Sequence, residues 1–284
     1  MAQINPIYID HALVAYSYLP NHPGKSTIYE RLLPYVSSTW EVPRLRARFG
    51  VTFECDLRDK VSRYIYYTGF DRRNCLVLKR LIKPGNTAFD IGANIGYFGL
   101  LFAKWMRGAG TVHAFEPFPQ TARRFERNLD LNPRLQAMVR LNRIALSDFT
   151  GTIAMSVPDE GNSGCNHLNA DGSEMINVMT LDAYVQREGL TRIDFIKIDV
   201  EGSEVALLQG AEVTLSRFHP VLMIEVNPTA LRRFGKTATE LIGTLTRLGY
   251  NMSYATRTGK LKRLKRLPVF GEEPDIFAFP MGYR

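Results

Sequence analysis

The sequence predicts an α/β protein with a mostly parallel sheet and helices on both faces. From residue 86 onward, apolar strand-like runs alternate with helical segments, and this rhythm is typical of such a sheet. The segment 86–101, NTAFDIGANIGYFGLL, shows it best, because a buried strand leads through glycines into a helix. A strand, a glycine-rich turn and a helix N-terminus together can hold a nucleoside-like ligand at the carboxyl edge of a parallel sheet.

Each element of this alternation is expected at a definite place. The sheet strands are expected over 87–91, 110–115, 138–144, 195–199 and 221–226. The helices between them are expected over 95–106, 119–131, 181–188 and 203–215. A helix over 237–248 leads to two last strands, 250–255 and 276–279, and an antiparallel insertion is expected from 152–157 and 175–179.

The first 82 residues are predicted to form an N-terminal cap, a substrate-recognition extension of a domain that covers 83–284. Prolines interrupt this part of the chain, and its apolar residues show little regular period. The elements expected here are a helix over 26–36, a strand pair from 51–56 and 60–67, and a helix over 74–82 that Lys83-Pro84-Gly85 ends.

Length and composition fit a globular protein with a full core. The chain has 284 residues, 45% of them hydrophobic, and a net charge of +8. This charge suits a plain basic protein or a protein with anionic partners, and charge alone does not choose between them. No apolar run approaches the ~18–20 residues of a membrane span, and the first residues lack a signal-peptide pattern. Three widely spaced cysteines argue against a disulfide framework, so we expect a cytoplasmic setting.

Asn94 separates the glycine turn from the dinucleotide-binding fingerprint. In G-A-N-I-G, Gly92 and Gly96 lie four residues apart, whereas the fingerprint needs a glycine where Asn94 stands, so that a pyrophosphate can approach the backbone. A nicotinamide oxidoreductase is therefore disfavoured. A cofactor with a nucleoside and no phosphates fits better, and S-adenosylmethionine (SAM) is such a molecule. Its carboxylate can use the helix N-terminus.

Polar residues at the next strand ends extend this expected site. Glu116 follows the strand 110–115 and can accept hydrogen bonds from both hydroxyls of a ribose. After the third strand, the small Ala145 leaves room for a base, and Asp148 can accept from an adenine amino group. A solvated turn acid is an equally good interpretation of Asp148, because Ser147-Asp148 precedes good turn residues.

An ordered set of motifs runs through residues 82–227. The motifs are DIGANIGYFG, FEP, ALSD, TLDAY, IDFIKIDVEGSE and HPVLMIEVN. In this order the sequence resembles class I SAM-dependent methyltransferases and, more narrowly, the FkbM family. The resemblance implies a Rossmann-like sheet of seven strands with an antiparallel final hairpin. It also implies methyl transfer, usually to a hydroxyl group.

The resemblance also implies roles for single residues. Asp90 and Gly92 would hold the methionine end of the cofactor, and Asn94 and Gly96 would shape the same loop. Glu116 would bind the ribose. The remaining expected cofactor residues are Ala145, Ser147 and Asp148, which would flank the adenine, and Asp199.

The segment 194–204, DFIKIDVEGSE, is predicted to carry the chemistry. Asp199 and Glu201 follow a strand and precede a helix, so both are expected at the carboxyl edge, with Lys197 on one face nearby. Three uses of the carboxylates remain open. One is a general base for an acceptor hydroxyl, and another is a divalent metal held by Asp199, Glu201 and Glu225. The third is simple positioning of the acceptor.

Three further features are candidates for function. Glu225 ends the buried strand VLMIEVN, and a charge there needs a partner, for which Lys197 or a metal would serve. His167, in the polar loop 161–168, is a candidate base, with a solvated histidine as the alternative. The run 257–266, RTGKLKRLKR, is expected in the loop between the last two strands, as a solvated hairpin or as an anion-facing arm.

We therefore expect a SAM-dependent O-methyltransferase for a sugar, a glycan or another hydroxylated metabolite, with an anionic acceptor among the options. An RNA methyltransferase and a non-catalytic scaffold remain as alternatives. Methyltransferases that act on amino groups of DNA or of protein glutamine carry an Asn/Asp-Pro-Pro-aromatic turn where this chain has DVEG. Nucleic acid is accordingly disfavoured as a partner.

Overall fold

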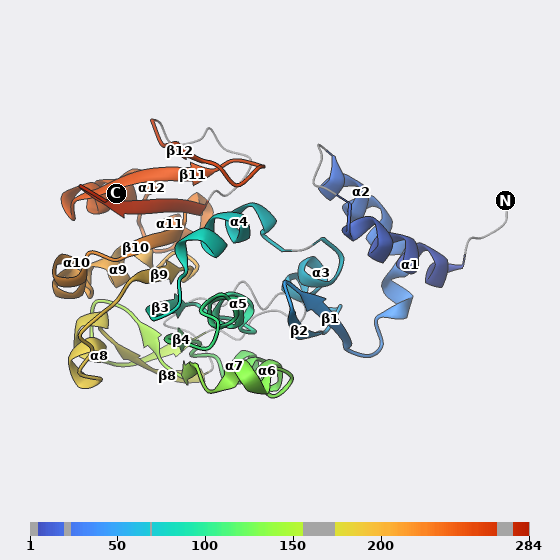
Figure 1. The fold of residues 1–284 in the computed structure, drawn as a ribbon, viewed down its shortest axis with the longest axis horizontal. Helices are drawn as coiled ribbons and strands as arrows, with labels where there is room; N and C mark the ends of the chain where they lie inside the picture. The colour runs from blue at the N-terminus through green and yellow to red at the C-terminus, as the bar shows by residue number, and fades with distance from the viewer. Residues whose placement is uncertain (1–4, 20–23, 69, 156–173, 266–274, 284) are drawn as a thin grey trace. The chain divides into compact units, whose positions relative to one another are not determined.

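The computed structural model describes residues 5–19, 24–68, 70–155, 174–265 and 275–283 (Figure 1). By compactness, they divide into a smaller unit that ends at Arg72 and a larger unit that begins at Arg73. The predicted division into a recognition extension, 1–82, and a methyltransferase domain, 83–284, is a functional one and stays a prediction.

In the part of the chain that the structure describes, an eight-stranded sheet with the order β12-β11-β13-β10-β9-β3-β4-β5 forms the centre of the larger unit. The strands are β3 (Asn86–Ile91), β4 (Gly110–Phe115), β5 (Val139–Asn142), β9 (Phe195–Ile198), β10 (Val221–Glu225), β11 (Tyr250–Ala255), β12 (Leu261–Arg263) and β13 (Asp275–Pro280). Neighbours from β5 to β10 run parallel, and β13 is antiparallel to both of its neighbours. The predicted α/β class, with a mostly parallel, Rossmann-like sheet and an antiparallel final hairpin, is confirmed. The expected number of seven strands is corrected to eight over the described residues, because β12 pairs with β11 at the edge of the sheet.

The basic run 257–266 contains the strand β12, and one of its two interpretations, a solvated hairpin, is confirmed over residues 257–265. The chain turns back at Gly259, whose N–H donates to the carbonyl of Thr256 at 2.8 Å. Leu261–Arg263 then pairs antiparallel with β11, and all three residues are exposed. The prediction placed this segment in a loop and missed that it forms an edge strand, which keeps its charged side chains in water.

Helices cover both faces of the sheet (Figure 1). They are α4 (Arg72–Leu81), α5 (Tyr97–Trp105), α6 (Pro119–Asp130), α7 (Pro133–Gln136), α8 (Leu181–Arg187), α9 (Glu204–Gln209), α10 (Glu212–Phe218), α11 (Pro228–Arg233) and α12 (Ala238–Arg247). On one face, Phe89, Ile91 and Ile198 join a core with apolar side chains of α8, α9, α10 and α12. On the other face α5 packs, and the ring of Phe102 lies 5.4 Å from that of Phe195. None of the helices in the described ranges is long and apolar enough to cross a membrane.

The single helix expected over 203–215 is in fact two helices, α9 and α10. The break falls at Gly210, whose carbonyl accepts from the backbone N–H of Asp182 at 3.0 Å. A Cβ on Gly210 would overlap the carbonyl oxygen of Ser147 and lie 2.9 Å from its carbonyl carbon. The chain thus needs a glycine here for close backbone contact, and the apolar period of the sequence hid this break.

The expected insertion forms a separate small sheet. It consists of β6 (Ala145–Leu146), β7 (Gly151–Met155) and β8 (Glu174–Met179), in the order β6-β8-β7 over the residues described. The antiparallel pairing of β7 with β8 confirms the insertion. The strand predicted over 138–144 is shorter, because the chain leaves the large sheet after Asn142 and Ala145 pairs with β8 instead.

The smaller unit contains α1 (Pro6–Ser17), α2 (Lys25–Leu32), η1 (Leu33–Thr39), β1 (Arg44–Arg48), β2 (Val51–Cys55), α3 (Lys60–Arg63) and η2 (Tyr64–Thr68). The strand predicted over 60–67 is wrong. Asp59 caps α3 by accepting from the backbone N–H of Ser62 at 3.0 Å, and this cap starts a helix in spite of β-favouring residues. The partner of β2 is β1, whose sequence RLRAR does not show a usual strand pattern.

Candidate cofactor and active site

Asp90 and Lys197 lie opposite each other on the adjacent parallel strands β3 and β9. Both are buried, with 0% and 4% of their surfaces exposed. Lys197 Nζ lies 3.6 Å from Asp90 Oδ1 and 3.1 Å from Asp199 Oδ2. It also donates to the carbonyl of Gly92 at 3.3 Å. Lys197 was one of two suggested partners for Glu225, and its hydrogen bonds and ion pairs go instead to these residues.

The charge of Lys197 is shared between two carboxylates. Burial lowers the pKa of Lys197, but Asp199 and Asp90 outweigh this effect and raise its pKa above the ordinary value. Burial raises the pKa of Asp90 to about 6, against the lowering effects of Lys197 and of the Gly99 N–H, which donates to Asp90 at 2.7 Å. The pKa of Lys197 and the pKa of Asp90 can both be raised, because one cation shared between two acids fully neutralises neither of them. This edge of the sheet therefore carries excess negative charge.

The two glycines of the turn allow close approaches within the protein itself. A Cβ on Gly92 would overlap the carbonyl oxygen of Asp199 and lie 2.8 Å from its carbonyl carbon. A Cβ on Gly96 would overlap the ring of Phe125. Both glycines also have positive φ angles, 75° and 85°. The sequence correctly indicated close backbone approach here, and the expected contact with a cofactor stays a prediction.

Asn94 and Glu116 connect the turn to the end of β4. Asn94 has a φ of 50°, and its backbone N–H donates to Glu116 Oε2 at 2.9 Å. The N–H of Phe118 donates to Glu116 Oε1 at 3.0 Å. Burial raises the pKa of Glu116 to about 7, although these two N–H groups lower it. A carboxylate has roughly four acceptor sites, so Glu116 keeps capacity for two further donors, as a ribose would supply.

The segment expected to flank an adenine is held by its neighbours. Ala145 lies in an apolar cluster with Phe118 and Val178. Ser147 is buried, and its Oγ donates to Asp148 Oδ1 at 3.1 Å. Asp148 itself is exposed. The roles of Ala145, Ser147 and Asp148 toward a base stay predictions.

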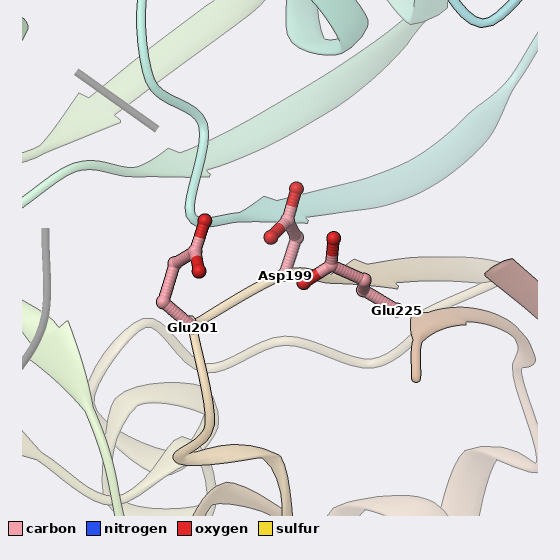
Figure 2. A group of neighbouring side chains, drawn as sticks. All are labelled: Asp199, Glu201 and Glu225. Carbon is pink, nitrogen blue, oxygen red and sulfur yellow. The ribbon is translucent and has the colours of Figure 1, made fainter. Parts of the chain in front are cut away.

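Three carboxylates meet at the ends of β9 and β10. One oxygen of each of Asp199, Glu201 and Glu225 lies within 4.8 Å of the others, and Figure 2 shows the three side chains together. Glu201 has a φ of 51° and Gly202 a φ of 108°, so a tight turn brings Glu201 back toward Asp199. The carboxylate of Glu204 serves this turn, because its Oε1 accepts from the Gly202 N–H at 3.1 Å.

Of the three carboxylates, that of Glu225 is in the least favourable environment for a negative charge. Its Oε2 atom is buried and has no hydrogen-bond partner among the residues described. Burial raises the pKa of Glu225 well above its usual range, and Asp199, Glu201 and Asp275 raise it further. Such a group binds a proton or a cation readily. His167, the other predicted base, lies outside the described residues.

The pairing of Lys197 with Asp90 was not predicted from the sequence. A signal for it was present, since each residue is a single charge inside an apolar strand, and buried charges need partners. Close backbone approach is expected from the sequence at Gly99 as well, and a Cβ there would lie 3.2 Å from Asp90 Oδ2, to which the N–H of Gly99 donates.

A family model described as the methyltransferase FkbM domain matches residues 90–252, more than half of the 284 residues. The chain belongs to the FkbM methyltransferase family. The matched range includes Asp90, Glu116, Lys197 and the carboxylate cluster of Asp199, Glu201 and Glu225.

Curated relatives resemble part of the FkbM-family chain. The 31-O-demethyl-FK506 methyltransferase FkbM of Streptomyces tacrolimicus is 31% identical, over 46% of this chain and 61% of its own length. The 2-O-methyltransferase NoeI of Sinorhizobium fredii is 29% identical, over 50% of this chain and 63% of its own length. The hexuronic acid methyltransferase AglP of Haloferax volcanii is 28% identical, over 48% of this chain and 54% of its own length. The chain thus spans less than two thirds of each relative.

Proposed function

We propose that this FkbM-family protein transfers a methyl group from SAM to a hydroxyl group of a sugar, a glycan or another hydroxylated metabolite. The observation that carries the proposal is the meeting of Asp90, Glu116 and Asp199 at the carboxyl ends of three adjacent strands. The names of two relatives specify methylation at oxygen, and a third names hexuronic acid, which supports a hydroxylated acceptor.

The residues at this edge suit SAM, which supplies a methyl group on a positively charged sulfur when it is bound. Glu116 would accept hydrogen bonds from the ribose hydroxyls, and Ala145, Ser147 and Asp148 would flank the adenine. Asp90, Gly92, Asn94 and Gly96 would hold the methionine end. The excess negative charge that Lys197 leaves around Asp90 and Asp199 favours a cationic ligand here.

We assign the proton transfer to the carboxylate cluster. Transfer of the methyl carbon to the acceptor oxygen would break the bond of that carbon to sulfur and release S-adenosylhomocysteine, and a neighbouring carboxylate would take the hydroxyl proton. Glu225 is the best candidate base, because its buried Oε2 has no hydrogen-bond partner among the residues described and burial raises its pKa, which strengthens its affinity for a proton. Asp199 and Glu201 would position the acceptor beside it. His167 remains the alternative base.

A divalent cation is the second candidate use of the same cluster. The unpartnered Oε2 of Glu225 and the short distances among Asp199, Glu201 and Glu225 favour it. These three side chains would hold the cation, and the cation would lower the pKa of the acceptor hydroxyl. Oxygen ligands of this kind suit magnesium or manganese.

Two other functions have less support. The hypothesis of an RNA methyltransferase is supported by the net charge of +8 alone. A non-catalytic scaffold would not need Asp90, Glu116 and Asp199 at one edge.

Isothermal titration of the full chain with S-adenosylhomocysteine tests the proposal. We expect binding at one site, and the absence of any binding heat up to millimolar ligand would overturn the proposed function.

A further inference from the structure

Arginines, and not apolar residues, line the inward face of β1 in the smaller unit. The strand reads RLRAR, so Arg44, Arg46 and Arg48 alternate with Leu45 and Ala47. Arg46 and Arg48 are 8% and 9% exposed, whereas Leu45 is 60% exposed. A strand with one buried face usually turns its apolar residues inward. The inverted pattern places positive charge in the interior of this unit.

Two of these arginines have partners that explain their burial. Arg44 Nη1 donates to Asp10 Oδ2 at 2.6 Å and forms an ion pair with it. Arg48 Nε donates to the carbonyl of Ile65 at 2.7 Å, and its Nη2 donates to the carbonyl of Tyr66 at 2.6 Å. These contacts join β1 to α1 and to η2, so both arginines support the structure.

The contacts of Arg46 do not explain why its side chain is buried. Its Nη2 donates to Ser17 Oγ at 2.7 Å, and its Nε is buried without a hydrogen-bond partner among the residues described. The guanidinium carbon lies 4.7 Å from the centre of the Tyr18 ring and 5.5 Å from that of Tyr66. Aromatic rings stabilise a cation over their faces but do not satisfy an in-plane N–H. A buried, charged donor without an acceptor is costly, so this edge of Arg46 suits an added acceptor.

Lys25 is a second buried cation, and it contacts the same residue, Ser17, as Arg46 does. It is 6% exposed, and its Nζ donates to the carbonyls of Ser17 at 3.3 Å and Leu19 at 2.6 Å. Ser17 therefore contacts Lys25 through its carbonyl and Arg46 through its hydroxyl. Burial lowers the pKa of Lys25, and the positive charges of Arg72 and Arg48 lower it further. An anion bound here would relieve this repulsion.

We propose that Arg46 and Lys25 form a binding site for an oxyanion, either a carboxylate or a phosphate group. The free Nε–H of Arg46 would donate to one oxygen of the anion, and Lys25 would supply the second positive charge. Tyr18, whose ring lies 4.7 Å from the guanidinium carbon of Arg46, is 68% exposed. The site goes beyond methyl transfer, since it lies within the smaller unit. It would favour ligands that carry an acidic group, such as sugar acids or sugar phosphates.

The test is isothermal titration of the full chain with sodium phosphate, sodium glucuronate and glucose at constant ionic strength. We expect phosphate or glucuronate to bind and glucose not to bind. Binding of phosphate alone would identify phosphate groups as the ligand chemistry, and binding of glucuronate would identify carboxylates. Arg46→Met should weaken binding about tenfold or more, because it removes a charged donor. Arg31→Met, the same change at an exposed position of α2, should leave binding unchanged.

Equal anion binding by the wild type and by Arg46→Met would overturn the proposal, as would the absence of anion binding in the wild type. Comparison of the far-ultraviolet circular dichroism spectra and urea denaturation curves of the Arg46→Met variant and the wild type shows whether the variant is folded. If that variant does not fold, Lys25→Met provides the same comparison, with the same expected loss. Failure of the wild type to bind S-adenosylhomocysteine would reject the proposed function and leave the anion result standing.

Discussion

Gly92 and Asp199 are in such close contact that Gly92 has no room for a Cβ atom. The added atom would overlap the carbonyl oxygen of Asp199. Next to this contact, the backbone N–H of Asp199 donates to the carbonyl of Ile91 at 3.0 Å. The glycine turn after β3 and the acidic loop after β9 therefore support each other. This contact requires a glycine whether or not a ligand is present.

Gly92→Ala should destabilise the protein by about 3 kcal/mol, since it combines a left-handed backbone with a steric overlap. Gly243→Ala is the matched control, because Gly243 lies within α12 and a Cβ there would have no neighbour within 4 Å. The control should stabilise the protein by up to about 1 kcal/mol. Urea denaturation measures both, and equal stabilities of the two variants would contradict the close contact.

Glu116→Ala should weaken the binding of S-adenosylhomocysteine about tenfold or more, because hydrogen bonds to a charged acceptor would be lost. Glu126→Ala, at a partly exposed ion pair with Arg143, should bind as the wild type does. Isothermal titration gives both affinities. Unchanged affinity in Glu116→Ala would remove Glu116 from the cofactor site.

The raised pKa of Glu116 predicts a pH dependence of stability. Burial raises this pKa from 4.5 to about 7, so the unfolded state loses its proton at a lower pH than the folded state does. The stabilisation is complete below the unfolded pKa and is lost as the pH rises through about 7. Between about pH 5.5 and about pH 8.5, the ligand-free protein should lose about 2 kcal/mol through this group.

Glu116→Gln should show a flatter pH profile, because its side chain does not titrate. Its overall stability should be lower, since an amide nitrogen replaces one of the two oxygens that accept backbone N–H groups. Urea denaturation across this pH range compares the two slopes. Parallel profiles would show that another group causes the dependence.

Lys197→Met should destabilise the protein by about 3–5 kcal/mol, because it leaves Asp90 charged and buried without its cation. Asp90→Asn in the same chain should restore part of this loss, since the asparagine oxygen can still accept from the N–H of Gly99. A double-mutant cycle by urea denaturation measures the coupling. Strict additivity of the two changes would argue against the ion pair.

Glu225→Gln should raise the free energy of unfolding at alkaline pH, because it removes a charge that is unfavourable through burial and through repulsion by Asp199 and Glu201. Manganese titration followed by electron paramagnetic resonance separates the two uses of this cluster. If the cluster acts only as a general base, manganese should stay free in solution. Binding by the wild type that is lost in Glu225→Gln would establish the metal site instead.

The sequence predicted the positions of the strands of the motif region along the chain well, because each motif ends an apolar run and the turn residues are distinctive. It failed where single side-chain contacts decide the local structure. The aromatic segment 60–67 reads as a strand, yet the side chain of Asp59 starts a helix there. The strand β1 was hidden because its inward residues are arginines that find partners on other elements.

The pairing in the candidate site depends on strand register, which composition does not reveal. Lys197 is opposite Asp90 on β3 and opposite Met223 on β10. Glu225 lies two residues beyond Met223, and its cross-strand partner on β13 is Asp275. The sequence shows Lys197 and the three acids Asp90, Asp199 and Glu225. Which of these acids pairs with Lys197 could be decided only from the register of the sheet.

The exposed strand β12 has a consequence for self-association. It forms one edge of the sheet in the described part of the chain, and its residues are Leu261, Lys262 and Arg263. An open edge offers unpaired backbone groups to which another chain can add a strand. A second copy that paired here through its own β12 would bring Lys262 and Arg263 close to their counterparts. Like charges across such a pair would oppose the growth of sheets from one molecule to the next.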